Sequence, residues 1–218
     1  MFSYYGSKSK LVSYYPYPKY PLIIEPFAGS AKYSLFHNDK EVIVNDKYRV
    51  VYEIWDYLVY KCTLDQVNQW PELKKGDDLR NFKLSQVEKW LLGFNVSYGL
   101  AHPNHIYTGY AAESGGVRQL KNNIRNFLPR IRHWTPTNES YEKLNNEDAT
   151  WFIDPPYKVG GEYYVENKIN YKHLADWCRS RKGQVIVCEN SNADWLPFRA
   201  FKESQSVKGT TCEMIWTN

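Results

Sequence analysis

Short apolar runs that each end in an acidic residue are the feature that most constrains the fold of this chain. Three such runs end in Glu25, Asp46 and Asp154. A further apolar run lies at residues 184–190, a final strand pair is expected near residues 204–207 and 212–216, and stretches with helical spacing lie at residues 48–60, 87–92 and 171–182. This alternation predicts an α/β fold with a mostly parallel sheet covered on both faces. Ligands of such sheets bind outside the carboxyl ends of the strands, which is where the three acidic residues stand.

The segment Asp154-Pro155-Pro156-Tyr157 has the features of a rigid pocket edge. Each proline holds φ at about −65° and lacks an N–H, so the carbonyls of Asp154 and Pro155 have little freedom to rearrange. Those carbonyls and the Asp154 carboxylate accept hydrogen bonds, and the Tyr157 ring offers a face on which a heterocycle stacks. The segment therefore predicts a site for the amino group of a nucleobase. The alternative is a Pro-Pro turn after a core strand.

Residues 21–31 combine a short apolar strand, an acidic residue and a loop of small residues that opens a helix. Small residues at that place let a cofactor approach the backbone closely. Neither GxGxxG nor GxxxxGK[ST] occurs in the segment, so it is not one of these phosphate-binding loops. We predict a cofactor loop here, and a structural turn is the alternative.

Asp46 ends the second apolar run. An acidic side chain at the end of the second strand of a nucleotide-binding half is well placed to accept hydrogen bonds from ribose hydroxyls. Asp46 is therefore the candidate ribose ligand. The alternative is an Asx turn or a helix N-cap for residues 48–60.

Together these segments resemble the Dam-type class of DNA adenine methyltransferases, which use S-adenosylmethionine. Tyr4-Tyr5-Gly6-Ser7-Lys8 is similar to the YxGGK block of that class, residues 25–30 are similar to its cofactor loop, and residues 154–157 match its DPPY block, in the order that the class uses. The resemblance covers residues 1 to about 60 and about 150 to the end. Ser7 and Ala31 stand where the class often has glycine.

The resemblance implies a Rossmann-like S-adenosylmethionine-dependent methyltransferase sheet formed by residues 1–61 and 149–218. Residues 62–148 would form a small, mostly helical target-recognition region. Asp154, Pro155, Pro156 and Tyr157 would grip and stack the target adenine. The cofactor would be held by Tyr4, Lys8, Glu25, Pro26, Phe27, Ala28, Gly29, Ser30, Asp46 and Asp154. An ordinary solvated N-terminus is the alternative for Lys8 and Lys10, and a half-buried strand or lid is the alternative to a pocket wall for Tyr163 and Tyr164.

The expected reaction follows from the electronic structure of adenine, because the lone pair of its exocyclic amine is delocalised into the ring. Hydrogen bonds from the amine to the Asp154 carboxylate and the Pro155 carbonyl would favour a tetrahedral nitrogen aimed at the methyl group. Alignment supplies roughly 7–11 kcal/mol and one charged acceptor about 3–4 kcal/mol, so geometry should carry most of the rate. Asp154 would orient the amine without having to take its proton. In a duplex substrate, the target base would have to be flipped out of the helix to reach the pocket.

A basic amphipathic helix is predicted at residues 117–131, inside the part of the chain that the resemblance matches loosely. The Gly/Ser/Tyr-rich residues 107–116 before it predict a mobile loop. A solvated helix face is the alternative to a nucleic-acid surface. The candidate nucleic-acid ligands are Arg118, Lys121, Asn122, Arg125 and Arg130.

Whole-chain properties fit this interpretation without deciding it. The net charge of +4 is compatible with nucleic acid but modest. The four cysteines and five histidines are scattered, so neither a metal site nor disulfides are expected. No apolar run is long enough to span a membrane and no signal peptide is evident, so we expect a soluble protein without a membrane partner, in the cytoplasm of a bacterial or phage-infected cell according to the resemblance.

The expected function is methyl transfer from S-adenosylmethionine to the 6-amino group of adenine in DNA, most readily duplex DNA. One alternative keeps the pocket and changes the polymer to RNA or a single strand, where bases need less extraction. Another alternative is a catalytically silent cofactor-binding or DNA-binding subunit of a larger complex. The recognition sequence and the oligomeric state stay open.

Overall fold

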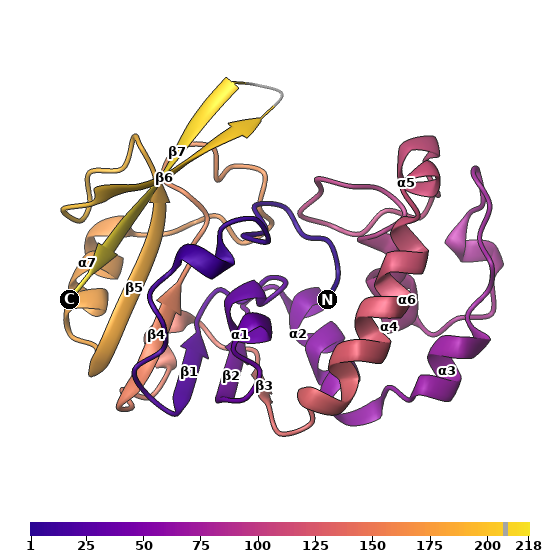
Figure 1. Cartoon of the computed structure of the whole chain (residues 1–218), viewed down its shortest axis with the longest axis horizontal. Helices are drawn as coiled ribbons and strands as arrows, with labels where there is room; N and C mark the ends of the chain where they lie inside the picture. The colour runs from indigo at the N-terminus through magenta and orange to yellow at the C-terminus, as the bar shows by residue number, and fades with distance from the viewer. Residues whose placement is uncertain (207–208) are drawn as a thin grey trace.

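One seven-stranded sheet organises the computed structural model, in the order β3-β2-β1-β4-β5-β7-β6 (Figure 1). The structure describes residues 1–206 and 209–218, so Val207 of the predicted strand pair lies outside the described residues. The strands from β3 to β5 are parallel, whereas β7 is antiparallel to both β5 and β6. The strands are β1 (Leu22–Glu25), β2 (Glu41–Asn45), β3 (Thr135–Thr137), β4 (Ala149–Ile153), β5 (Gly183–Asn190), β6 (Arg199–Ser206) and β7 (Gly209–Thr217). The α/β class and the mostly parallel sheet are confirmed.

Short helices connect the strands, and a longer helical segment separates β2 from β3. The α-helices are α1 (Lys32–Phe36), α2 (Arg49–Asp56), α3 (Leu64–Gln69), α4 (Gln86–Gly93), α5 (Gly109–Glu113), α6 (Gly116–Phe127) and α7 (Tyr171–Arg179). The other helical turns are η1 (Val12–Tyr14), η2 (Tyr57–Lys61), η3 (Leu79–Asn81), η4 (Leu128–Arg130) and η5 (Tyr141–Lys143). In the part of the chain that the structure describes, no helix is both long and apolar enough to cross a membrane.

The central strands are buried on both faces. Successive side chains point to opposite sides of a strand, and in β4 the side chains on each side enter a buried cluster. Phe152 packs in a cluster on one face, and its neighbours Trp151 and Ile153 pack in a second cluster on the other face. Each of the three side chains is at most 2% exposed. This double burial explains why β4 appears in the sequence as a continuous apolar run rather than as an alternating one.

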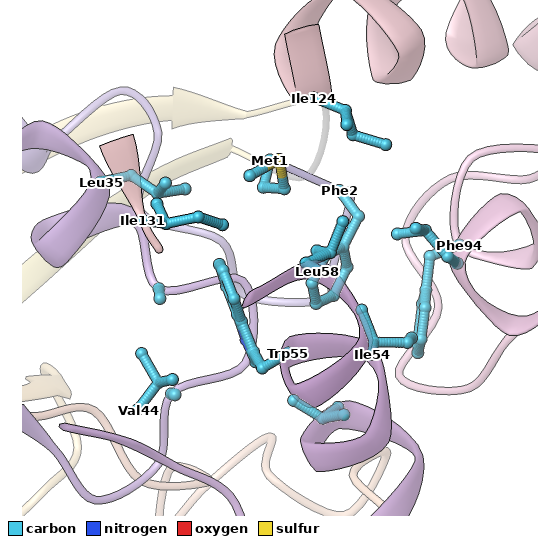
Figure 2. Close-up of a cluster of buried hydrophobic side chains, with 14 of the residues drawn as sticks. Met1, Phe2, Leu35, Val44, Ile54, Trp55, Leu58, Phe94, Ile124 and Ile131 are labelled. Carbon is cyan, nitrogen blue, oxygen red and sulfur yellow. The ribbon is translucent and has the colours of Figure 1, made fainter. Parts of the chain in front are cut away.

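The helices from α3 to α6 share a core with the sheet. Figure 1 shows them gathered at one side of the molecule, with α2 between them and the strands. Figure 2 shows Phe2 lying between Trp55 of α2 and Phe94 at the end of α4, with ring centroids 5.8 and 5.4 Å from that of Phe2. Ile124 of α6 belongs to the same buried cluster. The helical segment is therefore an extension of the main core.

Several elements differ from the sequence-based predictions. Thr135–Thr137, predicted to lie in the inserted region, forms edge strand β3 beside β2, and its Thr-Pro-Thr sequence carries no apolar run that would reveal it. The predicted loop at residues 107–116 contains α5. Helix α6 ends at Phe127, since Pro129 lacks the N–H that a continued α-helix needs and a 3₁₀ turn takes over. Strand β6 begins at Arg199, before the predicted start.

Candidate functional site

The segments predicted to form a site meet around one pocket at the carboxyl edge of the sheet. β1 and β4 are neighbours, and the chain leaves them toward opposite sides of the sheet, which makes this the topological switch point where α/β folds bind ligands. The space between the walls is about 1060 Å³, including the part open to solvent. Of the predicted residues, the pocket is lined by Tyr4, Lys8, Glu25, Phe27, Ala28, Gly29, Ser30, Asp46, Asp154 and Pro156.

Three predicted residues do not line the pocket. The Pro26 carbonyl accepts a hydrogen bond from Asn45 Nδ2 at 2.9 Å, so this residue joins the cofactor loop to the end of β2. Pro155 is buried behind the edge that Asp154 and Pro156 present. The Tyr157 hydroxyl points to Glu213 of β7.

Asp46 holds the predicted cofactor loop through one carboxylate oxygen. Its other oxygen forms the Asx turn that was the alternative prediction for this residue. Its Oδ2 accepts from the Gly29 N–H at 2.9 Å, and its Oδ1 accepts from the Tyr48 N–H at 2.9 Å. The second bond is an Asx turn, whereas Tyr48 is the N-cap of α2. Burial raises the pKa of Asp46 to about 6, and the two N–H donors limit that rise. The carboxylate still has free lone pairs toward the pocket, because each oxygen can accept more than one hydrogen bond.

Glu25 is a buried carboxyl group at the end of β1, 2% exposed. Its Oε1 accepts from the Ser34 N–H of α1 at 2.8 Å, which ties the strand to the helix across the cofactor loop. Burial raises the pKa of Glu25 to about 8, and the bonds with Ser34 lower it only in part. A carboxyl group whose pKa is raised in this way ionises when a positive charge comes close, because that charge stabilises the carboxylate form.

The cofactor loop itself bends through left-handed backbone. Gly29 has φ +46° and Ala31 has φ +45°, so the alanine adopts a conformation that usually belongs to glycine. The Gly29 carbonyl accepts from Trp55 Nε1 at 2.8 Å. A Cβ on Gly29 would lie 2.8 Å from Cδ1 of Tyr4, so the Tyr4 ring covers the loop at van der Waals distance. The N-terminal block and the cofactor loop thus form one wall, and Ser30 Oγ and Ser7 Oγ, 3.4 Å apart, extend it.

Lys8 and Asp154 form the charged centre of the pocket. Lys8 Nζ lies 2.8 Å from Asp154 Oδ1, as an ion pair outside hydrogen-bond alignment, because that buried oxygen makes no hydrogen bond. The ammonium also donates to the Gly6 carbonyl at 3.2 Å and lies 4.7 Å from the centroid of the Tyr157 ring. Burial lowers the pKa of Lys8, but the carboxylates of Asp154 and Glu213 outweigh burial, and the net effect raises the pKa.

Glu213 is a largely buried group near the pocket that the sequence patterns did not indicate. Its Oε1 accepts from the hydroxyls of Tyr15 at 2.7 Å and Tyr157 at 2.9 Å, and lies 3.8 Å from Lys8 Nζ. Burial raises the pKa of Glu213, and the Lys8 charge opposes that rise. No local motif marks this residue, because its place depends on the register of β7 against β5, where it faces Asn190.

The two tyrosines after the DPPY segment have different environments. Tyr164 lines the pocket, and its hydroxyl donates to the Tyr5 carbonyl at 3.1 Å, close above Gly6. Tyr163 is 62% exposed and packs its ring 5.7 Å from that of Tyr5, outside the pocket. Further wall residues that no pattern indicated come from η5, including Tyr141, whose ring lies 5.4 Å from that of Phe27.

The predicted amphipathic helix is present as α6, and its basic residues lie in different environments. Arg118, Asn122, Arg125 and Arg130 are exposed. Arg125 Nη1 donates to Asn122 Oδ1 at 3.0 Å, and Arg125 Nη2 donates to Asn68 Oδ1 of α3 at 2.9 Å. These four side chains reach solvent, but they do not form one continuous surface with the pocket, as the ends of α6 show.

Lys121 was predicted to be a nucleic-acid ligand, and the structure shows that this prediction is wrong. Its side chain is 8% exposed, and Nζ donates to the Trp70 carbonyl at 3.0 Å and to Glu72 Oε1 at 2.8 Å. The carbonyl belongs to the C-terminal end of α3, where helix acceptors lack an intrahelical partner. Lys121 therefore joins α6 to α3 and is not offered to a phosphate.

The two ends of α6 lie at opposite edges of the sheet. Beyond Arg130, His133 Nε2 lies 2.9 Å from the Lys40 carbonyl, directly before β2, and β3 begins at Thr135. Because the strands are parallel, this is the amino edge, away from the pocket. At the other end, the loop before α6 meets the N-terminal block, since the Leu100 carbonyl accepts from the Tyr5 N–H at 3.2 Å.

The loop that reaches the pocket edge is fixed to the start of α6. Ser114 Oγ donates to the Tyr98 hydroxyl at 3.2 Å, and a Cβ on Gly116 would lie 2.8 Å from that same hydroxyl oxygen. Arg118 lies in the first turn of the helix. Of the predicted basic groups, Arg118 is therefore the one placed on the side of the pocket.

No group of three or more potential metal-ligating side chains occurs within residues 1–206 and 209–218. The buried polar groups around the pocket are carboxylates, a lysine, hydroxyls and backbone N–H groups. This donor set suits hydroxyls, amines and positively charged organic groups.

Comparisons with known proteins assign no family. No family model matches the chain, and no curated protein gives a significant match. Among solved structures, one match is a conserved hypothetical protein of Streptococcus pyogenes, with a TM-score of 0.38 and 10% identity, covering 90% of this chain and 85% of that chain.

Proposed function

We propose that this protein is an S-adenosylmethionine-dependent adenine-N6 methyltransferase that acts on DNA. The observation that carries the proposal is the meeting of the YxGGK-like block, the cofactor loop and the DPPY segment around one pocket at the switch point of the sheet. These segments lie far apart in the sequence. A resemblance in short motifs alone would not require them to share a cavity.

The residues present fit the cofactor in charge and in hydrogen-bonding capacity. S-adenosylmethionine, when bound, supplies an electrophilic methyl group on a positively charged sulfur. Glu25, Asp46 and Asp154 give this pocket three carboxyl groups, which suit a ligand with a sulfonium, an ammonium and ribose hydroxyls. Asp46 would accept from the ribose while it holds the Gly29 loop, and the rings of Phe27 and Tyr141 offer apolar surface to a flat base.

Asp154 would act on the substrate amine as a hydrogen-bond acceptor. Its Oδ1 is buried and is paired in the free protein with the Lys8 ammonium at 2.8 Å, but without an aligned hydrogen bond, so part of its hydrogen-bonding capacity is unused. An adenine amino group would satisfy it. The catalytic gain would come mainly from orienting the amine toward the methyl group, with the carboxylate favouring the pyramidal nitrogen. The seven-stranded sheet with its antiparallel β6–β7 hairpin would then be the methyltransferase sheet that the resemblance implies.

The first test measures transfer of labelled methyl from S-adenosylmethionine to duplex DNA, single-stranded DNA and RNA, with the methylated nucleosides identified by mass spectrometry. The proposal expects N6-methyladenine in duplex DNA. Label only in RNA or in single strands would move the substrate to that polymer. Cofactor binding without transfer to any of them would favour a silent subunit of a larger complex.

Asp154→Asn is the variant that tests the chemistry, and Asp148→Asn is its matched control. Asp148 is exposed just before β4, so its replacement changes the same charge outside the pocket. We expect Asp154→Asn to lower kcat by at least 100-fold while cofactor binding stays largely in place, and Asp148→Asn to behave like the wild type. An active Asp154→Asn variant would contradict the mechanism.

A further inference from the structure

The Lys8 ammonium stands where the proposed function needs an adenine amino group. It lies 2.8 Å from Asp154 Oδ1 and 4.7 Å from the centroid of the Tyr157 ring. Asp154 is the group that the proposed function assigns to the amine, and Tyr157 is the ring that the resemblance assigns to the face of the target base. A base that enters must therefore displace the ammonium, and a buried ammonium needs another acceptor when it moves.

Glu213 is the second carboxylate within reach of that ammonium. Its Oε1 lies 3.8 Å from Lys8 Nζ, with side chains 11% and 9% exposed respectively. A rotation of the lysine end that carries Nζ from Asp154 to Glu213 would keep the ammonium beside a carboxylate throughout. At distances of this order in a buried site, an ion pair with a carboxylate compensates the cost of desolvating an ammonium.

Glu213 is held in place by contacts that do not involve Lys8. The Tyr15 hydroxyl donates to its Oε1 at 2.7 Å. The Tyr15 ring is 5% exposed and packs against Phe152 of β4 and Phe201 of β6, at centroid distances of 5.0 and 4.9 Å. The carboxylate is thus fixed between two strands of the sheet, which makes it a rigid acceptor.

The same oxygen fixes the stacking ring. The Tyr157 hydroxyl donates to Glu213 Oε1 at 2.9 Å. Because Tyr157 is bonded at its far end, its ring keeps one orientation when Lys8 leaves its face. Positioning of this kind matters for rate, since a displacement of about 1 Å in an active site costs roughly 100-fold.

We infer that Glu213 is a positioning residue of the proposed methyl-transfer site: it anchors the Tyr157 ring through the hydroxyl, and it receives the Lys8 ammonium when a target amine takes Asp154. The inference rests on the proposed function. It assigns a role to a residue of β7 that lies outside all three sequence blocks.

Glu213→Gln separates the two parts of this role, and Glu203→Gln is the matched control on the same hairpin. A glutamine keeps a carbonyl acceptor for the two tyrosine hydroxyls but removes the charge that would receive Lys8. Glu203 of β6 is exposed and pairs with Cys212 in the strand register, so it changes the same charge away from the pocket.

The measurement follows kcat, KM for duplex DNA, and the fluorescence of 2-aminopurine placed at the target position, which increases when the base leaves the stack. For Glu213→Gln we expect KM to rise about tenfold and the fluorescence increase to be largely lost, with the Kd for S-adenosylmethionine within twofold of the wild type. Glu203→Gln should match the wild type in all three. Equal KM and equal fluorescence in Glu213→Gln and wild type would overturn the inference and leave the proposed function standing.

Tyr157→Phe tests the anchor with a variant that keeps the ring. We expect kcat to fall at least tenfold with KM changed less than threefold, because the ring is present but free to tilt. If Glu213→Gln does not fold, as shown by loss of its thermal unfolding transition, this variant decides, and an unchanged kcat would overturn the inference. A wild-type protein that transfers no methyl group to any polymer would overturn both the proposed function and the inference.

Discussion

The Gly29 N–H donates to Asp46 Oδ2 at 2.9 Å, so the end of β2 holds the loop that follows β1. The Ala28 N–H donates to the Asn45 carbonyl at 2.9 Å and strengthens the same junction. Two neighbouring strands therefore shape the cofactor loop together. A ligand that bonds to Asp46 would be bound by a group that is already fixed by the backbone it approaches.

Asp46→Asn should weaken cofactor binding by roughly 10- to 100-fold, because one of the two bonds to backbone N–H groups and the charge toward the ribose are lost. Isothermal titration with S-adenosylmethionine and with its demethylated product measures the effect. The free energy of unfolding should fall by only about 1–2 kcal/mol, because one hydrogen bond to a charged group is weakened.

The control for Asp46→Asn is Asp39→Asn, which alters an exposed carboxylate in the turn before β2. Cofactor affinity in this control should equal that of the wild type. If Asp46→Asn binds cofactor as tightly as the control, Asp46 serves only the turn with Tyr48.

Gly29→Ala should destabilise the protein more than the backbone conformation alone explains. Gly29 has φ +46°, and an added Cβ would lie 2.8 Å from the Tyr4 ring. Gly76 has φ +92° and no heavy atom within 4 Å of an added Cβ, so Gly76→Ala carries the backbone cost without the collision. We expect Gly76→Ala to lose about 1 kcal/mol in urea unfolding and Gly29→Ala at least about 1 kcal/mol more. Equal losses would show that Tyr4 moves aside freely.

Three carboxylates of the pocket were predictable from the sequence because parallel strands bring their carboxyl ends to one edge. Glu25, Asp46 and Asp154 each follow an apolar run, and the sheet places all three around one cavity. The same logic could not reach Glu213, which lies within an antiparallel strand, where the register decides the position of each side chain. Its partners come from segments far apart in the sequence.

Burial of polar residues on α6 was not predictable from periodicity. Lys121 stands beside the apolar positions of an amphipathic helix, and its charge suggests an exposed site. Its burial arises from the Trp70 carbonyl at the end of α3, a partner from another helix. Strand β3 escaped detection for a related reason, since an edge strand of three residues with a central proline, Pro136, has almost no pattern.

Glu25 should make stability depend on pH. Its pKa is about 8 in the folded protein against an ordinary value of 4.5, because burial disfavours the charged form. Between these values the folded state binds more protons than the unfolded state, so the free energy of unfolding falls as pH rises through that window. The slope contributed by one such group reaches at most about 1.4 kcal/mol per pH unit.

Glu25→Gln tests this dependence, because the amide oxygen still accepts from the Ser34 N–H and no longer titrates. Urea unfolding at pH 5, 6, 7 and 8 should show the wild type losing stability relative to the variant as pH rises. Parallel curves for the two proteins would mean that Glu25 has an ordinary pKa in the folded protein. Asp46, whose pKa is about 6, contributes equally to both curves.

Lys121→Met should lower stability and leave nucleic-acid binding unchanged. The variant keeps a long apolar side chain but leaves the Trp70 carbonyl without its donor, which costs about 1–2 kcal/mol. Lys83→Met, at an exposed lysine, is the control and should change stability by less than about 0.5 kcal/mol. If folded Lys121→Met binds DNA more weakly than the wild type at several salt concentrations, Lys121 contributes to DNA binding after all.

The two ends of α6 should differ in their contribution to DNA binding, because only the start of the helix lies on the side of the pocket. The loop before α6 bonds to the N-terminal block through Leu100 and Tyr5, whereas η4 leads to the amino edge of the sheet at Arg130. A duplex that presents a flipped base to the pocket would pass Arg118 and not reach Arg130.

Salt titrations of DNA affinity by fluorescence anisotropy measure that difference. Arg118→Ala should weaken binding at low salt and reduce the slope of log K against log salt by about 1, because one phosphate contact releases roughly one counterion. Arg130→Ala removes the same charge from the same helical segment and should leave the slope unchanged. Equal reductions in the two variants would indicate a surface that runs along the whole helix, and no reduction in either would make the basic face of α6 a solvated one.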